Sequence, residues 1–249
     1  MTNEQIIQYA VEEGFAAAAI VDTSDIVFDP SFRPYCEENL CGQYGANYSC
    51  PPACGSPEAM KQRVLAHKKA LVLQTIWEIS DYSDMTLIKP AKASHNASEI
   101  RLVKRLRAEG CDGFIVGASG CALCSPCAQT LGEPCRFPEY QYSCMSAYCI
   151  FVKKLADKCG MEYDCGEGLL AFFGMYALNS SGNRYFEATL RIPEKNIDKF
   201  LANTDSYGKV YDTHPCIFLS MPDSSFFPKQ EVRFAVQLQH QSRHPKPHL

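Results

Sequence analysis

Cysteines at regular spacing are the residues of this chain best suited to chemistry. Cys121, Cys124 and Cys127 follow one another at every third position, and Cys135 lies a little further along. Thiolates spaced in this way on a tight loop can converge on one inorganic centre, and Cys-x2-Cys-x2-Cys is a ligand spacing of [4Fe–4S] clusters. Structural zinc more often takes its thiolates as separated pairs. The spacing therefore favours an iron–sulfur centre, with zinc as the alternative and with the participation of Cys135 left open by its longer interval.

A second group of four cysteines lies upstream, in a segment rich in proline, glycine and asparagine. The last two of them precede a helix that the Ser56-Pro57 start signal predicts, and the positive end of a helix stabilises nearby thiolates. The group either forms a second metal centre or donates ligands to the first. Buried packing as small apolar side chains is the alternative. Its members are Cys36, Cys41, Cys50 and Cys54.

Composition sets the class of protein and the compartment. The net charge of −4 gives no general attraction to nucleic acid or to an anionic membrane. Of the 14 cysteines, 13 lie between Cys36 and Cys165, but disulfide scaffolds of such density are typically short secreted chains. The first residues lack the pattern of a signal peptide, and no apolar run is long enough to span a membrane. We therefore expect a cytoplasmic protein with reduced thiols.

Apolar periodicity and turn residues predict the elements that carry these cysteines. Strand-like and helical stretches alternate, which is typical of an α/β layered domain with a mainly parallel sheet. His95 falls between a polar connection, 80–93, and a helix predicted to begin at Ser98, where it could act as a ligand or proton donor. The predicted strands are 15–21, 70–76, 113–117 and 169–178, and the predicted helices are 2–14, 56–67, 98–110 and 143–160.

The pattern divides the chain into three parts. All but one of the cysteines belong to a cysteine-rich α/β metal-binding domain predicted over residues 1–178. Residues 179–239 are expected to form an extension of uncertain fold, since the cysteines give way there to a turn-rich start and scattered strand-like runs. The last ten residues, 240–249, are expected to be disordered.

Two motifs together resemble a known family. They are the run Cys41-Gly-Gln-Tyr-Gly-Ala-Asn-Tyr-Ser-Cys50-Pro-Pro and the later run from Gly117-Ala-Ser-Gly-Cys121 to Glu133-Pro-Cys135-Arg-Phe-Pro138. They are similar to the cysteine-rich prokaryotic predicted metal-binding proteins (domain of unknown function 2284), over roughly residues 1–178. The resemblance implies a cytoplasmic, metal-binding α/β protein with no settled reaction. It also implies a set of ligands, namely Cys41, Cys50, Cys121, Cys124, Cys127 and Cys135. Spacing alone adds Cys36 and Cys54 to that set.

Several functions fit this sequence. An iron–sulfur protein working in electron transfer with a redox partner is the leading hypothesis. If only the first three cysteines of the loop bind, one iron stays open and the protein could be an enzyme. A zinc-binding or metal-handling module, or a domain whose metal only joins its long loops, are the non-redox alternatives.

Overall fold

The computed structural model describes residues 1–179 and the backbone of residues 189–191. Apart from Asn179 and those three residues, the predicted extension and the predicted tail lie outside the described residues. Within the described part of the chain, none of the helices is both long enough and apolar enough to cross a bilayer.

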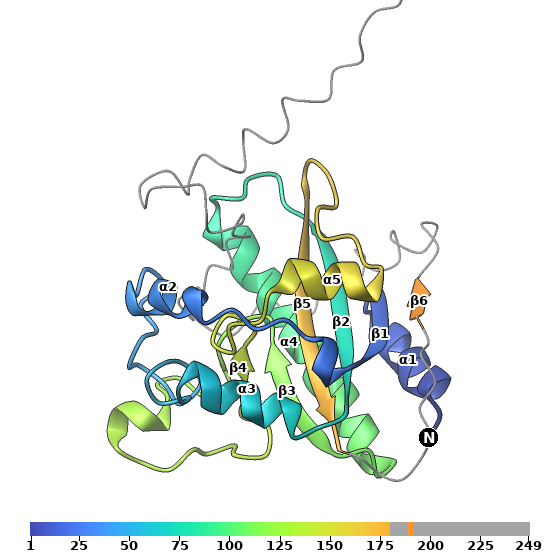
Figure 1. The fold of residues 1–249 in the computed structure, drawn as a ribbon. Coiled ribbons are helices and arrows are strands. Elements are labelled where there is room, and N and C mark those ends of the chain that lie inside the picture. Colours follow the sequence, from blue (N-terminus) through green and yellow to red (C-terminus); the bar gives the residue numbers. More distant parts are fainter. Residues whose placement is uncertain (180–188, 192–249) are drawn as a thin grey trace, which may run out of the picture. The chain divides into compact units, whose positions relative to one another are not determined.

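A mixed sheet forms the centre of the domain (Figure 1). Its strands lie in the order β4-β3-β5-β2-β1-β6, and every neighbouring pair is antiparallel except the parallel pair β3–β4. The long central strands pair along their whole length, and the last strand contributes only three residues. The bounds are β1 (Ala17–Asp22), β2 (Lys69–Glu78), β3 (Gly113–Gly117), β4 (Ser143–Cys144), β5 (Leu169–Leu178) and β6 (Thr189–Arg191).

The prediction of an α/β domain is confirmed, but the prediction of a mainly parallel sheet is wrong. Strands β2 and β3 do run in the same direction, as expected for two strands joined by a helix. They are not neighbours, however, because β5 inserts between them and runs antiparallel to both. Alternation of strands and helices along the chain does not reveal that a strand late in the sequence will lie between two earlier ones.

Helices cover both faces of the sheet. Figure 1 shows α5 in front of the strands, with α4 behind them. Thr2 and Gln5 form a capping box at the start of α1, Ser56 caps the predicted start of α3, and Gly160 ends α5 in the left-handed conformation. The bounds are α1 (Asn3–Glu12), α2 (Arg33–Glu37), α3 (Pro57–Leu65), α4 (Met85–Ala108) and α5 (Val152–Cys159).

Two predicted helix starts are wrong. Helix α4 begins at Met85 rather than Ser98, although Pro90 lies inside it, because Ile88 and Ala91 pack into an apolar cluster near the sheet. Tertiary burial outweighs the proline penalty there. The helix predicted from Ser143 begins only at Val152, because Ser143 pairs with β3 as part of β4.

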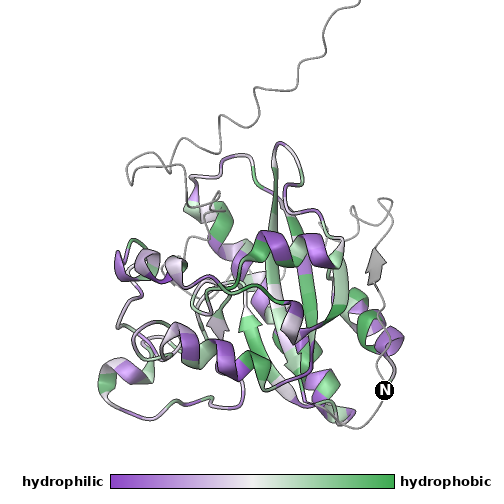
Figure 2. Cartoon of the chain, in the orientation of Figure 1, coloured by the Kyte–Doolittle hydropathy of each residue, from purple (hydrophilic) through white to green (hydrophobic). Residues whose placement is uncertain are grey.

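The main core lies between the sheet and the helices α1 and α4. Fully buried side chains meet there from all three elements, among them Ile6, Leu73, Leu102 and Tyr176. Figure 2 shows apolar residues along the central strands and polar residues on the outer sides of the helices. This apolar layer fixes α4 against the sheet, and α4 in turn supports the cysteine loop described below.

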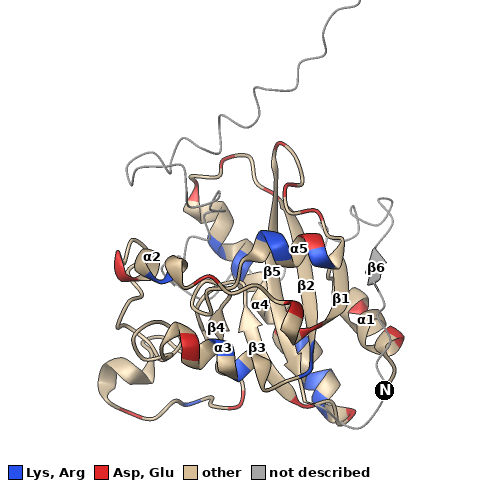
Figure 3. Ribbon diagram, in the orientation of Figure 1, with Lys and Arg blue, Asp and Glu red and all other residues tan. Residues whose placement is uncertain are grey.

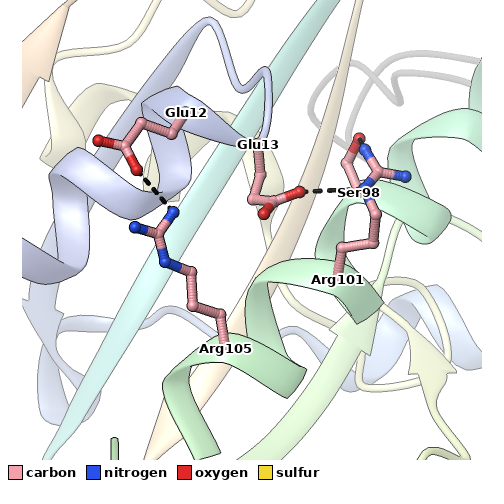
Figure 4. Close-up of polar contacts among 5 residues, drawn as sticks. All are labelled: Glu12, Glu13, Ser98, Arg101 and Arg105. Carbon is pink, nitrogen blue, oxygen red and sulfur yellow. Dashed lines mark hydrogen bonds and ion pairs between the residues drawn. The ribbon is translucent and has the colours of Figure 1, made fainter. Parts of the chain in front are cut away.

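Ion pairs join the outer edges of α1 and α4. Arg105 lies 2.6 Å from a carboxylate oxygen of Glu12, and Arg101 lies 3.0 Å from Glu13 while also bonding the hydroxyl of Ser98 (Figure 4). Figure 3 shows that charged residues lie mainly on the helices and loops and are sparse on the central strands. Arg101 and Arg105 therefore face solvent in ion pairs, and such surface pairs contribute little to stability.

Gly117, at the end of β3, has no room for a side chain. A Cβ there would lie 2.7 Å from the ring of Tyr142 and 2.9 Å from the Asn96 amide oxygen. We predict that Gly117→Ala lowers the free energy of unfolding by about 1–3 kcal/mol, since the ring and the amide must move. Chemical denaturation measures this, with exposed Gln8→Ala as a control expected to stay within about 0.5 kcal/mol. A Gly117→Ala loss no larger than the control's would contradict the packing described here.

Candidate metal centre

The cysteine loop, residues 118–142, leaves the sheet from the end of β3 and returns as β4. The two strands pair at Val116 with Ser143 and at Gly117 with Cys144. Asn96 of α4 holds the start of the loop, because its side chain accepts a hydrogen bond from the Ala118 amide at 2.9 Å and donates one to Ser119 at 2.8 Å. The start of the loop is therefore held in place by β3 and by Asn96 of α4.

Cys121 is the best-anchored thiol of the loop. Burial raises its pKa to about 11, while the backbone amides of Leu123 and Tyr142 act in the opposite direction by bonding to the sulfur. Cys124 and Cys135 are close enough for their charges to raise the pKa further. Amides directed at a sulfur are the surroundings that a bound thiolate needs. The structure therefore brings three of the four predicted ligands together.

Cys127 lies at the start of a short 3-10 helix, η3 (Ala128–Leu131). Its carbonyl accepts hydrogen bonds from the amide and the hydroxyl of Thr130, at 3.1 and 2.8 Å. The side chain is half-buried, like those of Cys124 and Cys135. All four cysteines of the loop are therefore half-buried.

The second group of cysteines gathers nearby, on the segments before α3 and after β4. Burial raises the pKa of Cys36 to about 12, and the charges of Cys144, Cys50 and Cys149 raise it further. Burial also raises the pKa of Cys54 to about 11, with smaller contributions from Cys50 and Cys144. Three predicted ligands, Cys36, Cys50 and Cys54, therefore share one neighbourhood with two cysteines that were not predicted as ligands.

Arg33 lies among these thiols and is only 8% exposed. Its guanidinium donates to the carbonyl oxygens of Gly55 at 3.1 Å and Ala147 at 2.8 Å, and it lies 4.0 Å from the sulfur of Cys54. Cys54 and Cys149 both interact with it electrostatically and by hydrogen bonding. Arg33 thus ties α2 to both of the segments that carry the other thiols.

Ser49 connects the two cysteine groups. Its hydroxyl accepts a hydrogen bond from the Cys121 amide at 3.0 Å and lies 3.8 Å from the sulfur of Cys50. The same hydroxyl donates to the side chain of Asn47 at 2.6 Å. The groups are therefore neighbours across one serine, although they come from segments far apart in the sequence.

The thiols lie in one region of the structure but do not converge on a single point. Among the described residues, no group of three or more His, Cys, Asp or Glu side chains is placed to hold a metal ion. None of the 13 cysteines of the described part of the chain is paired in a disulfide.

The other cysteines divide between surface loops and core. Cys41, a ligand predicted from the family resemblance, is half-buried in the turns ahead of Cys50. Cys111 belongs to the core between α1, α4 and the sheet, and Cys159 is buried on α5. Sequence reasoning missed Cys144 and Arg33 as site residues. Neither stands at a recognisable ligand spacing, and only the pairing of β4 with β3 brings Cys144 to the site.

A buried polar cluster lies on α4 close to Asn96. His95 is inside this helix and fully buried, which corrects the prediction that it precedes the helix in a polar connection. Its Nδ1 shares a 2.8 Å hydrogen bond with Thr75, whose hydroxyl also accepts from the indole of Trp77. Among the described residues, its Nε2 and both carboxylate oxygens of Glu99 lack hydrogen-bond partners. Burial lowers the pKa of His95 to about 3 and raises that of Glu99 well above its usual range.

The chain matches the family described as predicted metal-binding protein (DUF2284) over residues 19–177. The match covers more than half of the chain and includes both cysteine groups, so the chain belongs to this family. Comparison with curated proteins and with solved structures gave no match.

The Asn96 side chain anchors the cysteine loop, so its removal should expose Cys121. Asn96→Ala leaves the buried Ala118 amide without its acceptor, which costs roughly 1–3 kcal/mol locally. We predict that alkylation of Cys121 in reduced, metal-free protein becomes roughly tenfold faster, since about 1.4 kcal/mol corresponds to tenfold. Peptide mass spectrometry measures the rate, with exposed Thr86→Ala on the same helix as the control. An unchanged rate in Asn96→Ala would show that other contacts hold the loop.

Burial of neutral His95 should make stability depend on pH. The pKa of His95 is lowered to about 3 in the folded chain, compared with an ordinary value of 6.5, so the unfolded chain binds the extra proton between these limits. We predict that the His95 contribution to the free energy of unfolding falls as pH drops below about 6.5, by on the order of 1 kcal/mol per pH unit, down to about pH 3. Glu99, whose pKa is raised, contributes in the opposite direction above its ordinary pKa, so the comparison with a His95 variant isolates the His95 component. His95→Gln should lack this component when both proteins are denatured with urea across the range. Identical slopes in the two proteins would contradict the burial of a neutral imidazole.

Proposed function

We propose that the chain holds an iron–sulfur cluster, of the [4Fe–4S] type, on the loop 118–142 and serves in electron transfer. The ligands are Cys121, Cys124, Cys127 and Cys135. The proposal rests on a loop that has the cysteine spacing of a [4Fe–4S] cluster and in which the charges of Cys124 and Cys135 both act on Cys121. Membership of the predicted metal-binding family supports metal binding in general, and the cluster is the finer step.

The donor set of the loop fits such a centre. Thiolates are the ligands of iron–sulfur clusters, and amides that bond to the sulfurs tune the potential. Leu123 and Tyr142 supply amides of this kind to Cys121. Three thiols at every third position suit an iron–sulfur cluster better than a single zinc ion, whose thiolates usually come as separated pairs.

The surroundings of the loop suit outer-sphere electron transfer, which is the chemistry that a cluster closed by four thiolates supplies. The ligand residues are only half-buried, so a partner can approach them without opening the fold. Leu131 and Phe137, which flank Cys135 in the sequence, are 53% and 44% exposed. Apolar side chains at such a rim would give a redox partner protein a surface on which to dock.

Serine variants of the loop test the proposal. Cys121→Ser removes the anchored ligand and should abolish the visible absorption of protein purified without oxygen. Cys135→Ser should destabilise a cluster closed by four cysteines or shift its potential, measured by redox titration followed by electron paramagnetic resonance. Cys165→Ser, at a half-buried cysteine in another loop, is the matched control and should leave both signals unchanged.

Each outcome has a distinct meaning. An unchanged cluster in Cys135→Ser would show that three cysteines suffice and would favour an enzyme with an open iron over an electron carrier. Colourless wild-type protein that contains zinc and no sulfide would contradict the redox proposal and support a zinc-binding module.

A further inference from the structure

The residues around Cys135 fold back onto the residues around Cys127. The Glu133 amide donates a hydrogen bond, at 3.0 Å, to the carbonyl oxygen of the residue directly after Cys127. The Arg136 guanidinium donates one, at 3.4 Å, to the carbonyl oxygen of the residue directly before Cys127. The fold therefore closes up the longer interval that separates Cys135 from the other cysteines of the loop in the sequence.

Two consecutive residues of the upstream segment, Tyr48 and Ser49, contact both halves of this loop. The Tyr48 hydroxyl donates to the carbonyl oxygen of Glu133 at 2.7 Å, which lies two residues before the fourth cysteine. The Ser49 hydroxyl accepts from the Cys121 amide at 3.0 Å. Because consecutive Cα atoms are only about 3.8 Å apart, one short piece of backbone fixes the start of the loop and its later part relative to each other.

Further hydrogen bonds hold this pair of residues in place. Ser49 and Asn47 are both buried, and the Ser49 hydroxyl donates its one proton to the Asn47 side chain at 2.6 Å. The oxygen of that hydroxyl is therefore left to accept from the Cys121 amide. On the other side, the Gln141 side chain, near the end of the loop, donates to the Tyr48 carbonyl oxygen at 3.2 Å. A shift of the pair would break several of these bonds, and buried groups that lose their partners are costly.

We propose that Tyr48 and Ser49 are positioning residues that set Cys135 against Cys121, and that they thereby make Cys135 the fourth ligand of the loop centre. Tyr48 acts through Glu133, and Ser49 acts through the amide of Cys121 itself. The role of Cys135 as a ligand rests on the proposed function, whereas the positioning does not depend on a cluster. A centre closed by four thiolates leaves no iron open, so this positioning separates an electron carrier from an enzyme with an open iron.

The test uses the full chain, reduced and free of metal, with dibromobimane as the probe. This reagent alkylates two thiols in turn, with loss of two bromide ions, and so joins only thiols that lie close together. Tandem mass spectrometry of the peptides identifies the joined cysteines, and the measured quantity is the ratio of linked to singly labelled product. We expect Cys135 of the wild-type chain to be joined to Cys121. A wild-type chain in which these two cysteines are not joined would overturn the proposal.

Tyr48→Phe removes only the hydroxyl that bonds the loop carbonyl. We expect linking of Cys121 to Cys135 to fall about three- to tenfold, the factor that one hydrogen bond corresponds to. Linking of Cys121 to Cys124, which share the first half of the loop, should not change. Tyr44→Phe removes a hydroxyl from the same upstream segment and is the matched control, expected to leave both pairs as in the wild type. Equal falls in both pairs, which indicate a general loosening, or equal results for the two tyrosine variants would overturn the positioning role.

Protein purified with its cluster tests the role of Cys135 as a ligand. We expect Tyr48→Phe to release iron to a chelator about three- to tenfold faster than the wild type, and Tyr44→Phe to release it at the wild-type rate. Equal rates in all three proteins would overturn the part of the proposal in which positioning closes the cluster. Because cross-linking needs no metal, a chain that passes that test and holds no cluster would contradict the proposed function while supporting the positioning role.

Discussion

The parallel pairing of β3 with β4 is the contact on which both cysteine groups depend. Its two residue pairs close the loop 118–142, so that Cys121 leaves the sheet edge while Cys144 returns to it. Gly117, at the end of β3, lies so close to Tyr142 and Asn96 that it has no room for a side chain. Asn96 holds the adjoining residues of the loop by two hydrogen bonds. Without this edge, the loop cysteines and those before α3 would have no common location.

Burial and polar contacts act in opposite directions on the thiols of the candidate site. Burial raises the pKa values of Cys36, Cys54 and Cys121, which favours the protonated thiol and its packing as a small apolar group. A bound metal reverses this, because thiolate ligands lose their protons. Amides at Cys121 and a guanidinium at Cys54 are already directed at the sulfurs that would then carry charge. These contacts favour the thiolate form that a metal ligand must take.

Much of the local structure could be predicted from the sequence. The capping box at Thr2, the helix start at Ser56 and the strands 113–117 and 169–178 follow from local signals, and the structure has them. Strand order could not be predicted, because β5 lies in the sheet between β3 and β2, which both precede it in the sequence. Helix α4 also began earlier than expected, since burial against the sheet outweighed the breaking tendency of Pro90.

The candidate site shows the same division between local and distant information. Regular spacing identifies the cysteines of the loop, because ligands on one short segment leave a pattern in the sequence. Cys144 and Arg33 leave no such pattern, since they join Cys36 and Cys54 only through the folded sheet edge and the turn before α3. Spacing therefore predicts which cysteines share a loop, and the structure is needed to show which loops share a site.

The most direct test of the account is the metal and acid-labile sulfide content of the wild-type chain purified without oxygen, together with its visible spectrum. The account predicts brown protein that contains iron and sulfide in similar amounts, at about four of each or more per chain. Colourless protein with zinc and no sulfide, or with no metal at all, would contradict its central claim that the cysteine loop holds an iron–sulfur centre.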